Sequence, residues 1–221
     1  MSAAEVVERQ KRAAACAAAE LVHEGARVGL GTGSTVAHLL PALAARGLRG
    51  VRCVATSPAT ERAALELGLT VVALDELGHL DVTIDGADQI DPRGWLIKGG
   101  GAAHTREKIV AAATRRFVVI ASAEKAVSAL APPVPVEILR FGCRTTLAAI
   151  APAQLREVPA SPDGNLIADH LGAVGDPQHL ATLLSATPGV VEHGLFAPAL
   201  VSDILIAHGD RVEHRPGGKH A

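Results

Sequence analysis

The chain has 221 residues, of which 48% are hydrophobic and 20% charged, and its formal net charge is −2 at pH 7. That length and apolar content suffice for one large domain or two modest ones with packed cores, so a disordered chain is excluded. Aromatic residues make up only 2% and no basic stripe occurs, so we expect no nucleic-acid partner.

The first 20 residues predict an amphipathic helix. Charged residues such as Glu5, Arg12 and Glu20 bracket the alanine-rich run at 13–19, which does not fit a signal peptide. No apolar run along the chain approaches the roughly 20 residues that span a bilayer, so we also expect no membrane partner.

A glycine-rich turn follows the next predicted strand, at residues 27–30, and precedes a predicted helix at 36–45. Backbone N–H groups in such a turn, and at the start of the helix after it, face an anion. A dinucleotide fingerprint from Gly29 would need a glycine where Ser34 stands, and a Walker loop would need a lysine at position 33. The turn therefore predicts a site for a small phosphate, although a tight turn without a ligand is the alternative. Its binding residues would be Thr32, Gly33, Ser34 and Thr35.

Strands and helices alternate through the following stretch. Helices are expected from Pro58, with Ser57 as N-cap, and from Arg106, with Thr105 as N-cap. This alternation predicts a Rossmann-like, mostly parallel α/β sheet with helices on both faces, which binds ligands at the carboxyl ends of its strands. The further strands are expected at residues 51–55, 70–73, 80–85, 95–98 and 117–121.

Residues 85–107 contain the densest group of candidate reactive side chains. Asp85 ends one apolar run, and Lys98 ends another just before three glycines whose bare N–H groups can close on an anion. Glu107 would lie in the first turn of the helix from Arg106, whereas a capping box would need its acid at position 108. Complementing the helix dipole is the alternative role for Glu107. The joint occurrence of these groups favours a site.

The composition changes at Pro132-Pro133-Val134-Pro135, which indicates a domain boundary. Beyond it we expect strands at 134–139, 156–158, 166–170 and 190–196, with helices at 145–155 and 177–186. That order is typical of a smaller, ferredoxin-like α+β domain. Residues 200–208 are expected to return to the first sheet and 211–221 to form a polar tail. The predicted domains are therefore 1–130 with 200–221, and 131–199.

The cysteines and histidines show no pattern of metal ligation. Cys16, Cys53 and Cys143 are far apart and form no C-x-x-C pair, which favours a reduced, cytoplasmic setting. The ten histidines include neither H-E-x-x-H nor a His/Cys cluster at ligand spacing, so we expect no protein-held metal.

Three blocks together resemble the A-type family of ribose-5-phosphate isomerases: Gly31-Thr32-Gly33-Ser34-Thr35, Asp85-Gly86-Ala87-Asp88, and Lys98-Gly99-Gly100-Gly101-Ala102-Ala103 with Thr105-Arg106-Glu107-Lys108 after it. The resemblance runs nearly end to end and includes Pro135-Val136-Glu137, Asp163-Gly164-Asn165 and Gly194-Leu195-Phe196. Two positions depart from the family pattern: Gln89 stands where an acid is expected, and His104 where an apolar residue is expected.

The resemblance implies interconversion of D-ribose 5-phosphate and D-ribulose 5-phosphate through an enediolate, in the non-oxidative pentose phosphate pathway, without cofactor or metal. Glu107 matches the family's base, Asp85 its group for ring opening, and Lys98 would stabilise negative charge. A cytoplasmic homodimer is also expected. The implied substrate-binding residues are Thr32, Gly33, Ser34, Thr35, Asp85, Gly86, Ala87, Asp88, Lys98, Gly99, Gly100, Gly101 and Lys125, with Lys11 as a further candidate for the phosphate.

Two other functions remain open at this point. An aminosugar-phosphate isomerase/deaminase would use the same sheet edge, but no His-containing acid/base pair is evident. A non-catalytic sugar-phosphate sensor would normally carry a DNA-binding helix pair, and residues 1–25 have room for only one helix.

Overall fold

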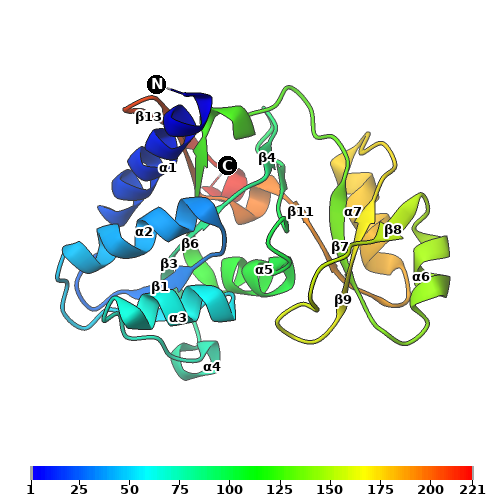
Figure 1. The fold of residues 1–221 in the computed structure, drawn as a ribbon, viewed down its shortest axis with the longest axis horizontal. Helices are drawn as coiled ribbons and strands as arrows, with labels where there is room; N and C mark the ends of the chain where they lie inside the picture. Colours follow the sequence, from blue (N-terminus) through cyan, green and yellow to red (C-terminus); the bar gives the residue numbers. More distant parts are fainter. Residues whose placement is uncertain (1, 221) are drawn as a thin grey trace.

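The computed structural model describes residues 2–220. Its largest sheet contains β1 (Arg27–Leu30), β2 (Arg52–Ala55), β3 (Leu80–Gly86), β6 (Thr114–Ser122), β12 (Asp203–His208) and β13 (Arg211–Pro216). The strands lie in the order β13-β12-β6-β3-β1-β2, and all neighbours are parallel except β12 and β13 (Figure 1). The predicted Rossmann-like, mostly parallel sheet is confirmed.

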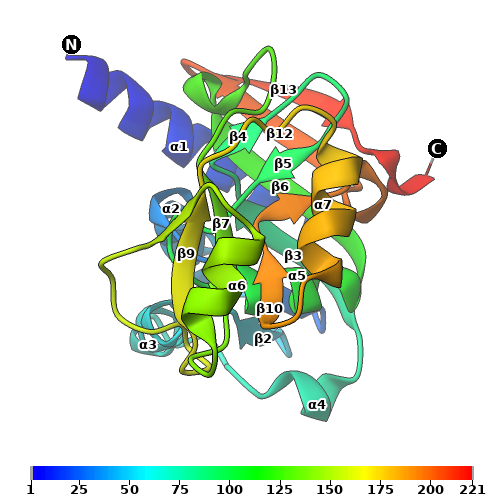
Figure 2. The same ribbon diagram turned by 90° about the vertical axis from the view of Figure 1, so that its right-hand side faces the viewer.

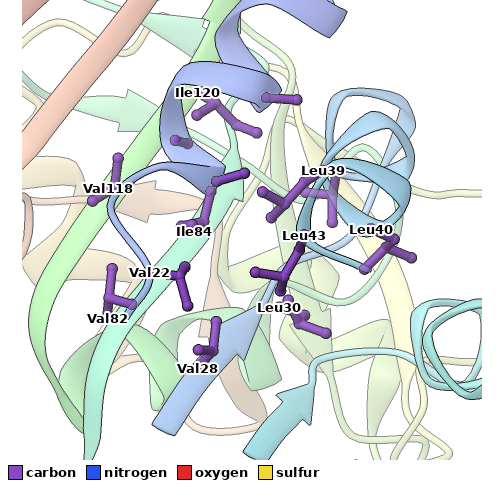
Figure 3. Close-up of a cluster of buried hydrophobic side chains, with 14 of the residues drawn as sticks. Val22, Val28, Leu30, Leu39, Leu40, Leu43, Val82, Ile84, Val118 and Ile120 are labelled. Carbon is purple, nitrogen blue, oxygen red and sulfur yellow. The ribbon is translucent and has the colours of Figure 1, made fainter. Parts of the chain in front are cut away.

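The helices of this part are α1 (Ala3–Ala19), α2 (Ser34–Ala45), α3 (Pro58–Glu66), α4 (Leu74–Leu77) and α5 (His104–Ala112). They cover both faces of the sheet, which explains why its strands are continuous apolar runs. Ile120 of β6 packs with Leu39 of α2 in the apolar core on one face of the sheet (Figure 3). Phe117 of the same strand packs with Ala111 of α5 in the core on the opposite face. Successive residues of β6 therefore serve opposite layers.

Polar residues set the starts of α1 and α3. Ser2 accepts a hydrogen bond from the N–H of Glu5 at 3.2 Å, and the Glu5 carboxylate accepts one from the N–H of Ser2 at 2.6 Å, which completes a capping box. Ser57 caps α3 by accepting from the N–H of Thr60 at 3.2 Å, and Pro58 occupies the first helical position. The predicted start of α3 is therefore confirmed.

A smaller antiparallel sheet follows, with β7 (Val134–Ile138), α6 (Cys143–Ala149), β8 (Ala153–Leu155), β9 (Leu166–His170), α7 (Pro177–Ala186) and β10 (Val190–His193). The strand order β10-β7-β9-β8 is that of a ferredoxin-like unit, with α6 and α7 seen against it in Figure 2. An apolar core lies against this sheet and includes Val136 and Leu184, together with Trp95 and Ile97 from the first part of the chain. The separate sheet supports the division into 1–130 with 200–221 and 131–199, which we retain as a proposal.

A third, short sheet joins the two parts of the molecule. It contains β4 (Gln89–Ile90), β5 (Leu96–Ile97) and β11 (Leu195–Phe196), in the order β11-β5-β4 and all antiparallel. The chain leaving β10 thus runs directly beside β5, and the N–H of Lys98 donates to the carbonyl of Gly194 at 2.8 Å. Lys98 therefore follows a strand of this small sheet and not a strand of the main one.

Several predicted elements are wrong. Residues 70–73 form only an isolated bridge, between Val71 and Cys53. The helix expected over 145–155 ends at Ala149, just before Pro152, which cannot continue a helix, and β8 lies at 153–155 in place of the strand expected at 156–158. The predicted polar tail contains β13, an edge strand in which every residue is at least partly exposed, so its charged side chains can reach solvent.

Candidate active site

One pocket lies beyond the carboxyl ends of β1, β3 and β6, where ligands bind in open α/β sheets. Five separate segments of the chain form its wall. The structure brings together there every residue that the sequence nominated for substrate binding except Asp85 and Lys11. The wall consists of Thr32, Gly33, Ser34, Thr35, Gly86, Ala87, Asp88, Lys98, Gly99, Gly100, Gly101, Glu107 and Lys125.

Asp85 lies beneath this pocket and is fully buried. Its Oδ1 accepts hydrogen bonds from the N–H groups of Thr32 at 3.1 Å and Gly86 at 2.7 Å, and its Oδ2 lies 2.9 Å from Lys98 Nζ. A Cβ at Gly31 would come within 1.9 Å of Asp85 Oδ1, so only glycine fits there. Burial raises the pKa of Asp85 above its usual range, and the charge of Lys98 partly offsets that effect.

Lys98 is a buried cation between two carboxylates. Its Nζ lies 2.9 Å from Asp85 Oδ2 and 3.1 Å from Glu107 Oε2, and it donates to the carbonyl of Gly86. Burial lowers the pKa of Lys98, but the two carboxylates outweigh that effect and raise it above the ordinary value. The contacts to the two carboxylates are ion pairs, whereas the hydrogen bond of Lys98 goes to the Gly86 carbonyl.

Glu107 lines the pocket although only 3% of its surface is exposed. Burial, followed by the nearby charge of Asp85, raises the pKa of Glu107 to about 8, although Lys98 acts in the opposite direction. α5 begins at His104, with Ala103 at the N-cap position, so the prediction of Thr105 as N-cap is wrong. The Thr105 hydroxyl instead donates to Glu137 on β7, which ties the first turn of α5 to the smaller sheet.

The glycine turn at 31–35 offers fewer free donors than the sequence suggested, because the N–H of Thr32 is bonded to Asp85 and its hydroxyl lies 2.8 Å from that of Thr56. α2 begins at Ser34, and no side chain caps it. Its first-turn N–H groups have no acceptor within the helix. These groups lie at one end of the pocket with the side chains of Ser34, Thr35 and Lys125, and N–H groups of this kind are suited to an anion.

Lys11 and His104 lie outside the pocket wall. Lys11 pairs with Glu8 on the same helix at 2.6 Å. His104 is fully buried, its Nε2 lies 3.3 Å from the carbonyl of Glu192, and burial lowers its pKa to about 4. His104 is therefore a neutral packing residue at pH 7. Among residues 2–220, no three His, Cys, Asp or Glu side chains are grouped so that they could hold a metal ion.

Two structural contributions were not foreseen from the sequence. The Phe196 ring centroid lies 5.4 Å from Lys98 Nζ, within the range of a cation–π interaction. Arg156, which follows β8 of the smaller sheet, contacts the glycine loop through the carbonyl of Gly99. Both contacts bridge segments distant in sequence, so no local pattern indicates them.

A buried lysine between two carboxylates, beside a phosphate-type turn at the carboxyl edge of a parallel sheet, defines an α/β enzyme that moves protons on a small anionic ligand. The family model described as ribose 5-phosphate isomerase A (phosphoriboisomerase A) matches residues 52–211. The chain belongs to this family.

Individual relatives agree with the family match. Ribose-5-phosphate isomerase A of Caulobacter vibrioides is 50% identical over 202 residues, covering 85% of this chain and 89% of the relative. The crystal structure of the Neisseria gonorrhoeae ribose 5-phosphate isomerase A has a TM-score of 0.89 at 34% identity, with 95% and 96% coverage. A D-ribose-5-phosphate isomerase in complex with phospho-erythronic acid has a TM-score of 0.90 at 31% identity, with 95% and 99% coverage.

Among the residues that the structure describes, no helix has both the length and the apolar character needed to cross a membrane.

Proposed function

We propose that this protein interconverts D-ribose 5-phosphate and D-ribulose 5-phosphate. The observation that carries the proposal is the Asp85–Lys98–Glu107 cluster at the floor of a pocket whose other end can bind a phosphate. The relative that was solved with phospho-erythronic acid supports it, because a phosphorylated sugar acid presents a phosphate and a planar carboxylate, like the enediolate of a sugar phosphate.

Glu107 is the base in this proposal. It takes the proton from C2 of the open-chain aldose, the C–H electron pair forms the C1–C2 double bond, and the C1 carbonyl oxygen gains the negative charge. Glu107 then returns the proton to C1, and the proton of the C2 hydroxyl passes to the negatively charged oxygen on C1, so that C2 becomes the ketone and C1 carries a hydroxyl. A pKa near 8 suits this task, because a base works best when its pKa is close to the working pH.

Lys98 can interact first with the charge of the Glu107 carboxylate and then with the charge of the enediolate oxygen. While Glu107 is ionised, its Oε2 forms an ion pair with Lys98 Nζ at 3.1 Å. Protonation of Glu107 removes that negative charge, so the ammonium group of Lys98 becomes available to the enediolate oxygen. Asp85 keeps Lys98 in place throughout, at 2.9 Å from its Nζ. The ring-opening role implied for Asp85 by family resemblance remains a prediction.

Gly33→Val is expected to raise the KM for ribose 5-phosphate by about 10- to 100-fold, the scale of one lost hydrogen bond to a charged group, with little change in kcat. Gly33 has a φ of 113°, which L side chains rarely adopt, so valine must shift the backbone at the start of α2. Gly47→Val is the matched control, because Gly47 has a φ of 58° and lies just beyond the other end of α2. Equal KM values for the two variants would move the phosphate site elsewhere.

The value of kcat/KM is expected to rise with pH and to level off above about 8. Below its raised pKa of about 8, Glu107 in the free enzyme holds a proton and cannot accept another. A phosphate monoester titrates near pH 6, so its inflection is separable from that of Glu107. Initial rates from about pH 6 to pH 10 measure the profile, and a flat profile through that range would contradict this assignment.

A coupled assay for ribulose 5-phosphate, with and without EDTA, tests the proposed function. Turnover of ribose 5-phosphate in both conditions is expected, with none of glucosamine 6-phosphate. Turnover of the aminosugar phosphate would favour an isomerase/deaminase. Binding of ribose 5-phosphate without turnover would favour a sensor.

A cytoplasmic homodimer is part of the same proposal. The three cysteines, Cys16, Cys53 and Cys143, are all free thiols, which supports a reducing compartment. Phe141, which is 93% exposed on the smaller domain, supports a contact with a second copy of the chain. Light scattering of the wild type and of Phe141→Glu measures the mass directly, and a monomeric wild type would overturn the dimer.

A further inference from the structure

Arg156 reaches from the smaller domain to the glycine loop at 99–101. Its Nη1 donates to the carbonyl oxygen of Gly99 at 3.0 Å and, less closely, to that of Gly100 at 3.4 Å. Its Nε donates to Asp169 Oδ2 at 3.0 Å, and its Nη2 donates to the other oxygen of the same carboxylate. The planar guanidinium therefore makes two hydrogen bonds to the Asp169 carboxylate and at the same time binds the carbonyl oxygens of the glycine loop.

The orientation of these two carbonyls fixes the direction of two N–H groups. In a planar trans peptide the C=O and the N–H point in opposite directions. The carbonyl of Gly99 shares its peptide plane with the N–H of Gly100, and the carbonyl of Gly100 shares its plane with the N–H of Gly101. The N–H of Gly100 donates to Asp88 Oδ2 at 2.8 Å. Asp88 and the three glycines, at positions 99, 100 and 101, all line the pocket. Arg156 therefore sets which way the N–H groups of the pocket wall point.

The loop cannot be stiffened by side chains of its own. Gly99 has a φ of 107°, and a Cβ there would lie 2.7 Å from His104 Nδ1 and 2.9 Å from Pro135 Cβ. Glycine has more backbone freedom than any other residue, so the loop depends on hydrogen bonds for its shape. The N–H of Ala102 donates to the Gly99 carbonyl at 3.1 Å, Asp88 holds the N–H of Gly100, and Arg156 adds its bonds to the carbonyls from the smaller domain.

We propose that Arg156, oriented by Asp169, is a positioning residue that preorganises the glycine loop, and with it the N–H of Gly101, for the negative charge of the enediolate, while Asp88 holds the N–H of Gly100. The inference rests on the proposed function, since that charge develops only during the isomerisation. Donors that are fixed before the reaction stabilise a developing charge more than donors that must first reorient.

Arg156→Met keeps much of the aliphatic part of the side chain and removes the guanidinium group. We expect kcat to fall by about 10- to 100-fold, the scale on which small displacements of catalytic groups act, and the affinity for phospho-erythronic acid to fall in parallel. The KM for ribose 5-phosphate should change by less than about threefold, because the phosphate end of the pocket is untouched. Arg156→Lys should recover little, because one ammonium group cannot bond Asp169 and the loop in the same geometry.

Arg140→Met is the matched control. Arg140 also lies in the smaller domain and donates from Nε to a glycine carbonyl, that of Gly164, at 2.9 Å, outside the pocket. The Arg140→Met variant should retain the kcat of the wild type. A folded Arg156→Met variant with kcat within twofold of wild type would overturn the inference. Full activity in Arg156→Lys would also overturn it, because charge alone would then suffice.

Amide hydrogen exchange separates this inference from the proposed function. Exchange at residues 99–102 should be faster in Arg156→Met than in wild type and unchanged in Arg140→Met. If the wild type failed to turn over ribose 5-phosphate, the proposed function would fail, and the exchange result would still decide whether Arg156 orders the loop. Unchanged exchange in Arg156→Met would show that it does not.

Discussion

Replacing Glu107 with Gln is expected to lower kcat by about 10² to 10⁴ while the KM for ribose 5-phosphate changes little, because glutamine keeps the shape of the side chain and loses its basicity. Glu107 is the carboxylate on the pocket wall that has the strongest reason to be a base, since burial raises its pKa to about 8. Steady-state kinetics on the folded variant measure the effect. Glu192→Gln is the control, because Glu192 pairs with Lys108 at 2.7 Å outside the pocket.

An isotope experiment examines the same step without a mutation. In D₂O the wild-type enzyme should place deuterium at C1 of ribulose 5-phosphate, because a carboxylic acid can exchange its proton with solvent during the lifetime of the enediolate. A product without deuterium would indicate a direct hydride shift. Near wild-type turnover by Glu107→Gln would remove Glu107 from the mechanism.

Replacing Lys98 with Ala or Met is expected to lower kcat by about 10² to 10³, the usual scale for losing one donor to an oxyanion. Loss of the cation also leaves Asp85 and Glu107 buried without a counter-charge, so their pKa values should rise further and the kcat/KM profile should move to higher pH. Kinetics across the pH range measure both effects. A change confined to KM would make Lys98 a ground-state ligand.

Lys108→Met is the matched control for Lys98. Both ammonium groups lie over the ring of Phe196, with Nζ to centroid distances of 4.9 Å for Lys108 and 5.4 Å for Lys98, but only Lys98 lines the pocket. The urea midpoint of each variant reports how much stability is lost. A Lys108→Met variant as inactive as Lys98→Met would indicate a structural role for both lysines.

The sequence was most informative where local chemistry decides the structure. β6 and β3 are apolar on both faces because a parallel sheet buries both, and α7 begins with Asp176 at its N-cap and a proline first, so these elements could be predicted. Most candidate site residues were equally visible, since glycines and isolated ionisable groups at strand ends have few purely structural reasons to occur together.

Long-range pairing decided the features that sequence reasoning missed. Thr105 has the side chain of an N-cap, yet its hydroxyl donates to Glu137, 32 positions away in the chain. Arg156 and Gly99 are 57 positions apart, and Phe196 approaches Lys98 only because β11 pairs with β5. The strand expected at 70–73 pairs with β2 only at Val71, and the strand expected at 156–158 lies three residues earlier, at 153–155, where the chain pairs with β9.

The order of the main sheet also has a consequence for synthesis of the chain. β6 lies between β3 and β12, but β12 is translated about 80 residues after β6 ends. At about 5–20 residues per second, the apolar edge of β6 waits roughly 4 to 16 seconds for its partner. During that time the nascent chain presents an unpaired, apolar strand edge, a site where aggregation begins. Residues 203–216, which form no part of the pocket wall, thus end this exposure when they pair with β6 and close the sheet.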